Sequence, residues 1–329
     1  MRRLVLAGLF LGAVGLAADA SAQTTAAISL SIPPTGRANG MGQAFVAVAD
    51  DGTATWWNPG GLGLLPEKKD GQITYSKLVP DLADDVAYIF PSFTFPVKTW
   101  GTFGASIVYL NYGTSTASSE TGELGQDFTS YEVAPTLSYG TKVMDGLGVG
   151  ASFKYIRVDL APAVAGLSQA AVGTTFAFDL GALYKVPGDM VNVGLTVQNL
   201  GPNISFIAPD RNDAIFRNLK AGVAVNAYNK NAAHVLVAAD VNQLLVKFET
   251  TTGEERFPKP IWNGGVEAGY QTSVNIAVRA GYVYDDDGDI KDPTFGLGIG
   301  YRGFEFDYAS IPQASGLDRV SKFSLGAQF

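Results

Sequence analysis

The sequence predicts an all-β fold, a transmembrane antiparallel β-barrel of about 14 strands with an N-terminal hatch, or plug, inside its lumen. Three observations lead to this prediction. From about Gln72 to Phe329, segments of about 8–12 residues alternate between apolar residues and small or polar ones. The connections between these segments alternate between short and long. A glycine-rich stretch precedes them and does not alternate at all.

Residues 1–22 have the features of a signal peptide that is cleaved during export. Arg2 and Arg3 supply positive charge, an apolar run follows, and Ala20-Ser21-Ala22 forms an A-x-A cleavage site. No later stretch reaches the roughly 20 apolar residues of a membrane-spanning helix. The chain has no cysteine, which excludes disulfides and thiolate metal sites. We therefore expect export without a helical anchor.

The stretch GRANGMGQAFVAVADDGTATWWNPGGLGLL runs from Gly36 to Leu65 and is compact and rich in glycine. It is too short to bury a core of its own. We therefore expect residues 23–66 to form a hatch that sits inside something larger. The candidate site residues of this hatch are Gly36, Gly40, Met41, Gly42, Asp50, Asp51, Trp57, Asn58, Pro59 and Gly60.

Residues 67–329 are expected to form the barrel. Alternation is clear in Val191, Val193 and Leu195, which are separated by Asn192 and Gly194. The predicted strands lie near 72–78, 86–95, 102–112, 128–140, 147–158, 174–185, 191–200, 217–227, 233–242, 262–271, 273–284, 293–301, 303–310 and 320–329.

The connections distinguish a barrel from a soluble β-sandwich, whose strands would also alternate. Tight turns such as PVKTW and VPGDM follow every second strand, and the intervening connections are mostly longer. Outer-membrane barrels have this pattern, with short turns in the periplasm and long loops outside. An even number of strands closes the sheet and removes the edges that lipid would leave unsatisfied.

The alternation also predicts which residues face lipid and which face the lumen. Val193, Phe178 and Leu297 are expected to point outward and Thr196 inward. Tyrosines near the predicted strand ends suggest interfacial girdles, although aromatic residues are common in strands generally.

Glycines and charges on the predicted inward face form a candidate lumen wall. A glycine in a strand often marks the close approach of another backbone, although it can also bend a strand for closure. We expect the hatch to press most tightly near Gly296 to Gly300. Charged side chains there should pair with one another or with the hatch, because an unpaired buried charge is costly. The wall candidates are Gly296, Gly298, Gly300, Arg279, Glu305 and Asp307.

The glycine-rich stretch, and in particular its close Trp57-Asn58-Pro59-Gly60-Gly61-Leu62, resembles the N-terminal signature of the PorV/PorQ family of outer-membrane proteins. That family belongs to the FadL-like (long-chain fatty-acid transporter) group of barrels with an N-terminal hatch. The resemblance implies a barrel of about fourteen strands with the hatch folded into its lumen. One departure is Gly60, where fatty-acid transporters usually carry alanine, and this weakens the inference of the same gating.

Other function classes find little support. A formal net charge of −8 with scattered cations argues against nucleic acid and against a polybasic membrane-surface module. No catalytic motif is present, and the single histidine, His234, is expected at the membrane interface. The run from Asp285 to Asp289 departs from a calcium loop and predicts a solvated acidic loop. We therefore expect no enzyme, no cofactor and no metal.

Two apolar loops, 160–172 and 203–216, are expected either to fold over the barrel mouth or to meet a partner. The first hypothesis is an accessory barrel of a protein export apparatus such as the type IX secretion system. Its loops would dock a translocon, a cargo domain or a surface protein. The second is a FadL-like channel for long-chain fatty acids or other hydrophobic solutes, and the third is a structural barrel subunit of an envelope assembly. All three place the chain in the outer-membrane lipid of a bacterial cell.

Overall fold

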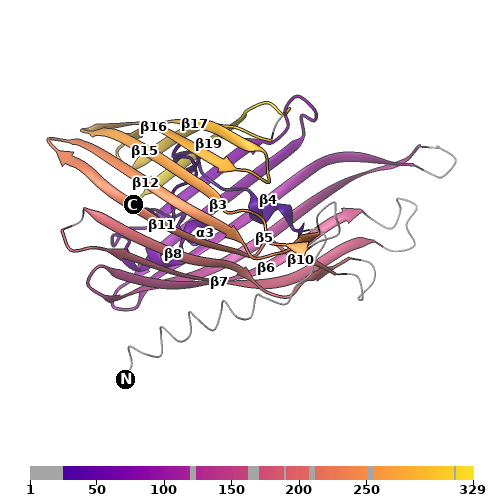
Figure 1. Cartoon of the computed structure of the whole chain (residues 1–329), viewed down its shortest axis with the longest axis horizontal. Coiled ribbons are helices and arrows are strands. Elements are labelled where there is room, and N and C mark those ends of the chain that lie inside the picture. The colour runs from indigo at the N-terminus through magenta and orange to yellow at the C-terminus, as the bar shows by residue number, and fades with distance from the viewer. Residues whose placement is uncertain are drawn as a thin grey trace, which may run out of the picture.

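In the computed structural model, fourteen antiparallel strands close into one barrel (Figure 1). The structure describes residues 25–118, 124–161, 170–188, 190–206, 212–249, 255–314 and 316–329. The predicted signal peptide and most of the predicted loop 160–172 lie outside these residues.

The barrel strands agree with all fourteen predicted segments, so the predicted barrel is confirmed. They are β2 (Asp70–Lys77), β3 (Val86–Val97), β4 (Gly101–Ser118), β5 (Leu124–Met144), β6 (Leu147–Ala161), β7 (Ala171–Lys185), β8 (Val191–Leu200), β11 (Asn218–Lys230), β12 (Ala233–Leu244), β15 (Ile261–Gln271), β16 (Val274–Asp285), β17 (Ile290–Tyr301), β18 (Phe304–Ile311) and β19 (Val320–Gln328).

Each strand pairs with its neighbour in the chain, and β19 pairs with β2 to close the sheet, with Leu325 opposite Ile73. Strands β4 and β5 are longer than predicted because their pairing continues into polar sequence, where Ser115 lies opposite Phe128. This hairpin projects beyond the other strands in Figure 1.

The two rims of the barrel differ as predicted. At one rim the connections are the short segments 98–100, 145–146, 186–190, 231–232, 272–273 and 302–303. At the other rim lie longer loops, two of which contain short strands: β9 (Ile204–Ser205) and β10 (Asn212–Ile215) in one, β13 (Phe248–Glu249) and β14 (Glu255–Arg256) in the other. Short turns of outer-membrane barrels are periplasmic, so the second rim faces outward.

The predicted facing of the test positions is confirmed. Val193, Phe178 and Leu297 are 49%, 45% and 55% exposed, whereas Thr196 is completely buried. The exposed side chains on alternate positions are mostly large and apolar, which suits a surface that contacts lipid.

Val193→Arg should therefore impair membrane assembly, and it should lower the free energy of unfolding of the barrel by about 2–4 kcal/mol if the residue lies near the bilayer midplane. Thr196→Ser, an inward change that keeps the hydroxyl, should have little effect. Urea titration of the barrel refolded into lipid vesicles measures both. Equal tolerance at the two positions would contradict the assigned facing.

The chain before the barrel forms only short elements, and we call residues 25–65 the N-terminal segment. In order they are β1 (Thr25–Ala26), the 3-10 helix η1 (Ile28–Ser31), α2 (Gly36–Gly40), α3 (Ala54–Trp57) and the 3-10 helix η2 (Pro59–Leu64). In the part of the chain that the structure describes, no helix is both long and apolar enough to cross a membrane.

Candidate functional site

The N-terminal segment packs against inward-facing residues on several sides of the barrel. Helix α2 contacts β16–β19, α3 contacts β4 and β5, and η2 contacts β4–β8. Figure 1 shows the segment, in indigo, among the strands of the barrel. Although the geometry suits a plug, the division into a hatch (23–66) and a barrel (67–329) stays a prediction.

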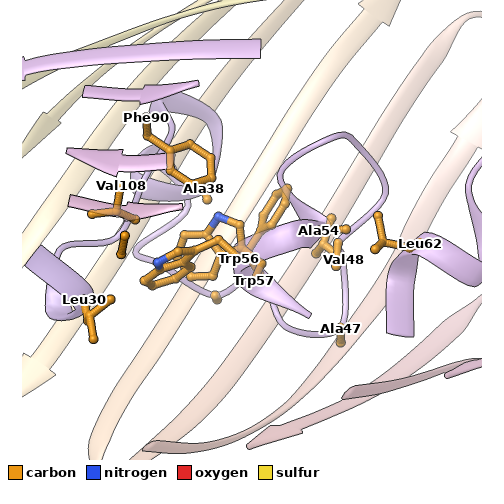
Figure 2. Close-up of a cluster of buried hydrophobic side chains, with 14 of the residues drawn as sticks. Leu30, Ala38, Ala47, Val48, Ala54, Trp56, Trp57, Leu62, Phe90 and Val108 are labelled. Atoms are coloured by element: carbon orange, nitrogen blue, oxygen red, sulfur yellow. The ribbon is translucent and has the colours of Figure 1, made fainter. Parts of the chain in front are cut away.

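An apolar cluster fills the centre of this interface. Phe45 is completely buried and Trp57 almost completely, and their ring centroids lie 5.6 Å apart. Figure 2 shows Trp56 and Trp57 in the middle of the cluster, with Phe90 and Val108 of the barrel wall nearby. The segment thus obtains from the barrel the core that it is too short to make alone.

Wall glycines allow the segment backbone to approach closely. A Cβ atom at Gly150 would overlap the Pro59 carbonyl, and one at Gly265 would overlap the Met41 backbone. Gly40 and Gly296 face each other, because a Cβ on Gly40 would lie 2.9 Å from the Gly296 Cα. These wall glycines therefore allow the segment backbone to lie against the strands, and do not serve only to bend the strands.

The expectation of closest contact from Gly296 to Gly300 is wrong. Only Gly296 meets the N-terminal segment; Gly298 makes room for the Arg279 guanidinium, and Gly300 lies beside Asn275. The physical reason is that β17 runs towards the short-turn rim, where Gly298 and Gly300 line an opening instead of a contact.

Inward-facing polar side chains bind the segment backbone. The Asp240 carboxylate accepts hydrogen bonds from the Phe45 and Val46 amides at 2.7 and 2.9 Å. Glu132 accepts from the Ser29 amide at 2.8 Å, and Thr294 accepts from the Gly42 amide at 2.9 Å. Because a short segment has few backbone partners of its own, these bonds satisfy buried amides that would otherwise cost free energy.

The Asn58-Pro59 break is held by its own side chain. Asn58 donates to the carbonyls of Val46 and Ala182 at 2.9 and 3.0 Å and accepts from the Gly60 amide at 3.0 Å. The third bond caps η2. The first residue of η2 is a proline, which has no backbone N–H that would need an acceptor. Asn58 thus joins two parts of the segment to β7.

Two arginines form the charged part of the site. The Arg37 guanidinium bonds to Asp50 at 2.7 Å and to both oxygens of Glu267 at 3.0 and 3.1 Å. Arg279 bonds to the same Glu267 at 2.6 Å and to Asp307. Arg37 and Asp50 belong to the segment, whereas the other three residues lie on β15, β16 and β18. The network therefore ties the segment to the wall.

Beside this network lies a polar cavity of about 400 Å³ that opens at the short-turn rim. Its lining includes Asp51, Asp70 and Glu305, and the Glu305 side chain is 48% exposed. Burial raises the pKa of the Asp51 carboxyl to about 6, an effect that Arg37 opposes and that the nearby carboxylates of Asp50 and Asp70 reinforce.

Asp51→Asn should stabilise the protein at neutral pH by an amount on the order of 1 kcal/mol. Because the folded pKa of Asp51 lies above its unfolded value, the native protein binds more protons between about pH 4 and 6 and loses stability as pH rises through that window. The variant lacks this loss, while its amide oxygen can still accept from the Thr53 amide. Urea midpoints at pH 4 and 7.5 measure the difference, and a gap of equal size at both pH values would contradict the assignment.

Among the other inward-facing charges, Lys154 and Asp179 form an ion pair at 2.7 Å in which both side chains are buried. The Lys220 ammonium lies over the Trp56 ring, 4.2 Å from its centroid. The predicted pairing of these inward charges is therefore observed.

The outward half of the lumen contains apolar side chains as well as polar ones. Tyr88, Phe90 and Ile156 are almost or completely buried there and belong to the same cluster as Leu30 of the segment. The loop between β8 and β11 folds over this region: β10 pairs in parallel with β1, and Ile215 is completely buried. For the described part of the predicted loop 203–216, folding over the mouth is thus the observed alternative.

Two expectations about single residues are corrected or refined. His234 does not lie at the membrane interface, because its ring faces the cavity with Nε2 3.4 Å from Glu267 Oε1. Alternation with its neighbours along β12 could have indicated this. In the acidic run, Asp287 pairs with Arg256 at 2.9 Å. Among the residues that the structure describes, no cluster of acidic, histidine or cysteine side chains could hold a metal ion.

Comparison with known families gives one match. The family model described as "Type IX secretion system protein PorV" matches residues 16–251 of the 329. A comparison with curated protein sequences finds no match.

Solved structures share the fold. The toluene transporter TodX of Pseudomonas putida is 15% identical, with a TM-score of 0.57 over 90% of this chain and 97% of that one. The toluene transporter TbuX of Ralstonia pickettii is 16% identical, with a TM-score of 0.56 over 88% and 96%. A FadL homologue of Pseudomonas aeruginosa is 13% identical, with a TM-score of 0.55 over 91% and 98%. The family and the fold are those of secretion or transport barrels of the bacterial outer membrane.

Proposed function

Since this chain belongs to the PorV family of type IX secretion system proteins, we propose that it is an accessory, non-enzymatic barrel in a type IX-like secretion or cell-surface assembly. In this role its outer loops and rim dock a protein partner, such as a translocon, a cargo domain or a surface protein. The N-terminal segment keeps the lumen closed, so that the barrel acts as a docking subunit and not as a conduit.

The observation that carries this proposal is the number of buried bonds between the segment and the wall. Asp240 holds two segment amides, Asn58 holds the Ala182 carbonyl, and Arg37 shares Glu267 with Arg279. A gate that moved at each transport event would have to break these bonds and leave charges and amides unpaired in a buried site. Such an arrangement favours a fixed plug.

The outward rim supplies a surface for docking. The hairpin of β4 and β5 projects beyond the other strands, and its paired residues Thr114–Thr129 and Thr116–Asp127 are polar (Figure 1). A projecting, hydrogen-bonded hairpin presents side chains to a partner with little further loss of conformational entropy. We therefore place the partner contact at this rim.

A disulfide between segment and wall tests the fixed plug. A Cβ atom at Gly104 on β4 would lie 2.5 Å from Thr55 Cγ2, so Thr55→Cys with Gly104→Cys brings two thiols within bonding reach. The chain has no native cysteine to interfere. We expect the oxidised variant to support secretion or surface display of cargo as well as the reduced variant does. Each single cysteine variant is the control for the substitution alone.

Loss of activity on oxidation, with recovery on reduction, would contradict the fixed plug. A second experiment isolates the tagged mature protein from its own outer membrane in mild detergent and identifies retained proteins and small molecules by mass spectrometry. Stoichiometric recovery of a large barrel or a surface protein is the expected result. A barrel recovered alone and without a solute would instead favour a structural subunit.

A channel for hydrophobic solutes is the second candidate, and one observation favours it. The outward half of the lumen includes apolar side chains, with Tyr88, Phe90 and Leu110 buried on the wall, and the similar folds include toluene transporters. Retention of a fatty acid on the purified barrel, together with uptake that the oxidised disulfide abolishes, would establish this function in place of the first.

A further inference from the structure

The short-turn rim carries a basic residue at every connection except 272–273. Each lies in a turn, at the end of the strand before it, or just before β2, so residues from distant parts of the sequence form one ring around the barrel. We call this set the basic rim. Its members are Lys68, Lys69, Lys98, Lys142, Lys185, Lys230 and Arg302.

Within the part of the chain that the structure describes, most of these cations have no carboxylate partner within 4 Å. Lys98, Lys230 and Arg302 are exposed, and Lys185 is half-buried. Within the described residues, the only ion pair of the basic rim joins Lys142 Nζ to Asp145 Oδ1 at 2.9 Å, and both side chains are exposed. An exposed pair of this kind contributes little and can exchange for another anion.

At the opposite rim, several cations are paired with carboxylates. Arg256 bonds to Asp287 at 2.9 Å, and both Lys259 and Lys291 bond to Asp286. The hydrogen bond and charge of Arg256 hold the pKa of the Asp287 carboxyl below its usual range. Among the described residues, ion pairs are therefore more frequent at this rim than at the basic rim.

Large apolar side chains accompany the basic rim. Trp100, Met144 and Met190 are 68%, 52% and 63% exposed in or beside the same turns. The Arg302 guanidinium lies 5.1 Å from the Tyr301 ring centroid. Aromatic and apolar residues of this kind mark the membrane–water interface, so the neighbouring cations lie at the level of lipid headgroups.

From this arrangement we propose that the basic rim is a binding site for the phosphate groups of anionic phospholipids in the periplasmic leaflet. Neighbouring connections are two strands apart, roughly 10 Å, which leaves room for separate headgroups around the barrel. Each headgroup gains the attraction of an unpaired cation, and its acyl chains contact the adjacent apolar surface. The site binds a negatively charged headgroup and contacts the acyl chains attached to it. A soluble anion has the charge but no acyl chains, so it would make only the first of these contacts.

The test uses the mature barrel in nanodiscs that contain phosphatidylcholine and phosphatidylglycerol. After mild detergent extraction, mass spectrometry measures the ratio of the two lipids that remain bound. We expect phosphatidylglycerol to be enriched on the wild type. In a variant with Lys98→Gln, Lys142→Gln and Lys185→Gln, the ratio of bound phosphatidylglycerol to phosphatidylcholine should fall roughly fivefold for each lysine removed at low salt. High salt should lower this ratio for the wild type.

Matched variants make the result specific. Lys77→Gln, Lys259→Gln and Lys291→Gln remove the same charge at the other rim and should keep the enrichment. Lys98→Arg, Lys142→Arg and Lys185→Arg keep the charge and should keep the enrichment too. A heat-dependent shift in gel migration verifies that each barrel is folded. The proposal is overturned if the three short-turn variants retain phosphatidylglycerol as the wild type does, or if both rims behave alike.

Discussion

Lys154→Met should destabilise the folded barrel by about 3–5 kcal/mol, because it leaves a buried carboxylate without its cation. Lys154 Nζ lies 2.7 Å from Asp179 Oδ2, and the two side chains are 2% and 0% exposed. Asn199 completes the arrangement, since its side-chain oxygen accepts from Lys154 and its amide donates to Asp179, both at 2.7 Å. Urea unfolding of the barrel in lipid vesicles measures the loss.

Two controls separate this effect from a general loss of a lysine. Lys142→Met removes a lysine whose ion pair with Asp145 is exposed, so it should cost less than about 1 kcal/mol. The double variant Lys154→Met with Asp179→Leu replaces the buried pair by apolar groups and should recover most of the stability. If Lys154→Met costs no more than Lys142→Met, the buried pair is not formed in the membrane.

Gly265→Val should cost about 3 kcal/mol or more, because the new side chain would occupy space that the N-terminal segment fills. A Cβ atom at this position would lie 2.6 and 2.7 Å from the C and Cα atoms of Met41. These are backbone atoms, which cannot rotate away as a side chain could. The segment must shift, and protease should then cleave it faster from the periplasmic side.

The preceding residue supplies the control. Gly264 lies on the opposite face of β15, where an added Cβ would have no atom within 4 Å. Gly264→Val should therefore leave both stability and protease resistance almost unchanged. Equal effects of the two valines would contradict the position of the segment inside the barrel.

Much of the barrel could be predicted because its signal is local. The alternation of Phe176, Ala177, Phe178 and Asp179 identifies a strand with one apolar and one inward face, and burial follows the same alternation. Turn length then identified the rims. The ends of β4 and β5 could not be predicted, since polar residues that extend a hairpin beyond the membrane have no alternation to mark them.

The candidate site was predictable in composition but not in its contacts. The sequence identified the acidic and glycine residues of the segment, and it placed Arg279 and Asp307 on the inward face. It could not indicate that Arg37 meets Glu267, which is 230 residues away. Such a contact depends on the tilt of the strands and on the combined register of all strand pairs around the closed barrel. The sequence of a single strand does not determine either of them.

The sequence by itself determined the fold class, the approximate number of strands and the inward or outward direction of most strand side chains, because all three follow from segments with a period of two along the chain. Tertiary structure alone decided which wall glycines meet the segment, why Gly298 and Gly300 line a cavity, and why His234 faces Glu267. It also gathered Lys98, Lys142 and Lys185 at one rim. These lysines are scattered along the chain, and the closure of the barrel by β19 and β2 arranges them as part of a ring around one rim.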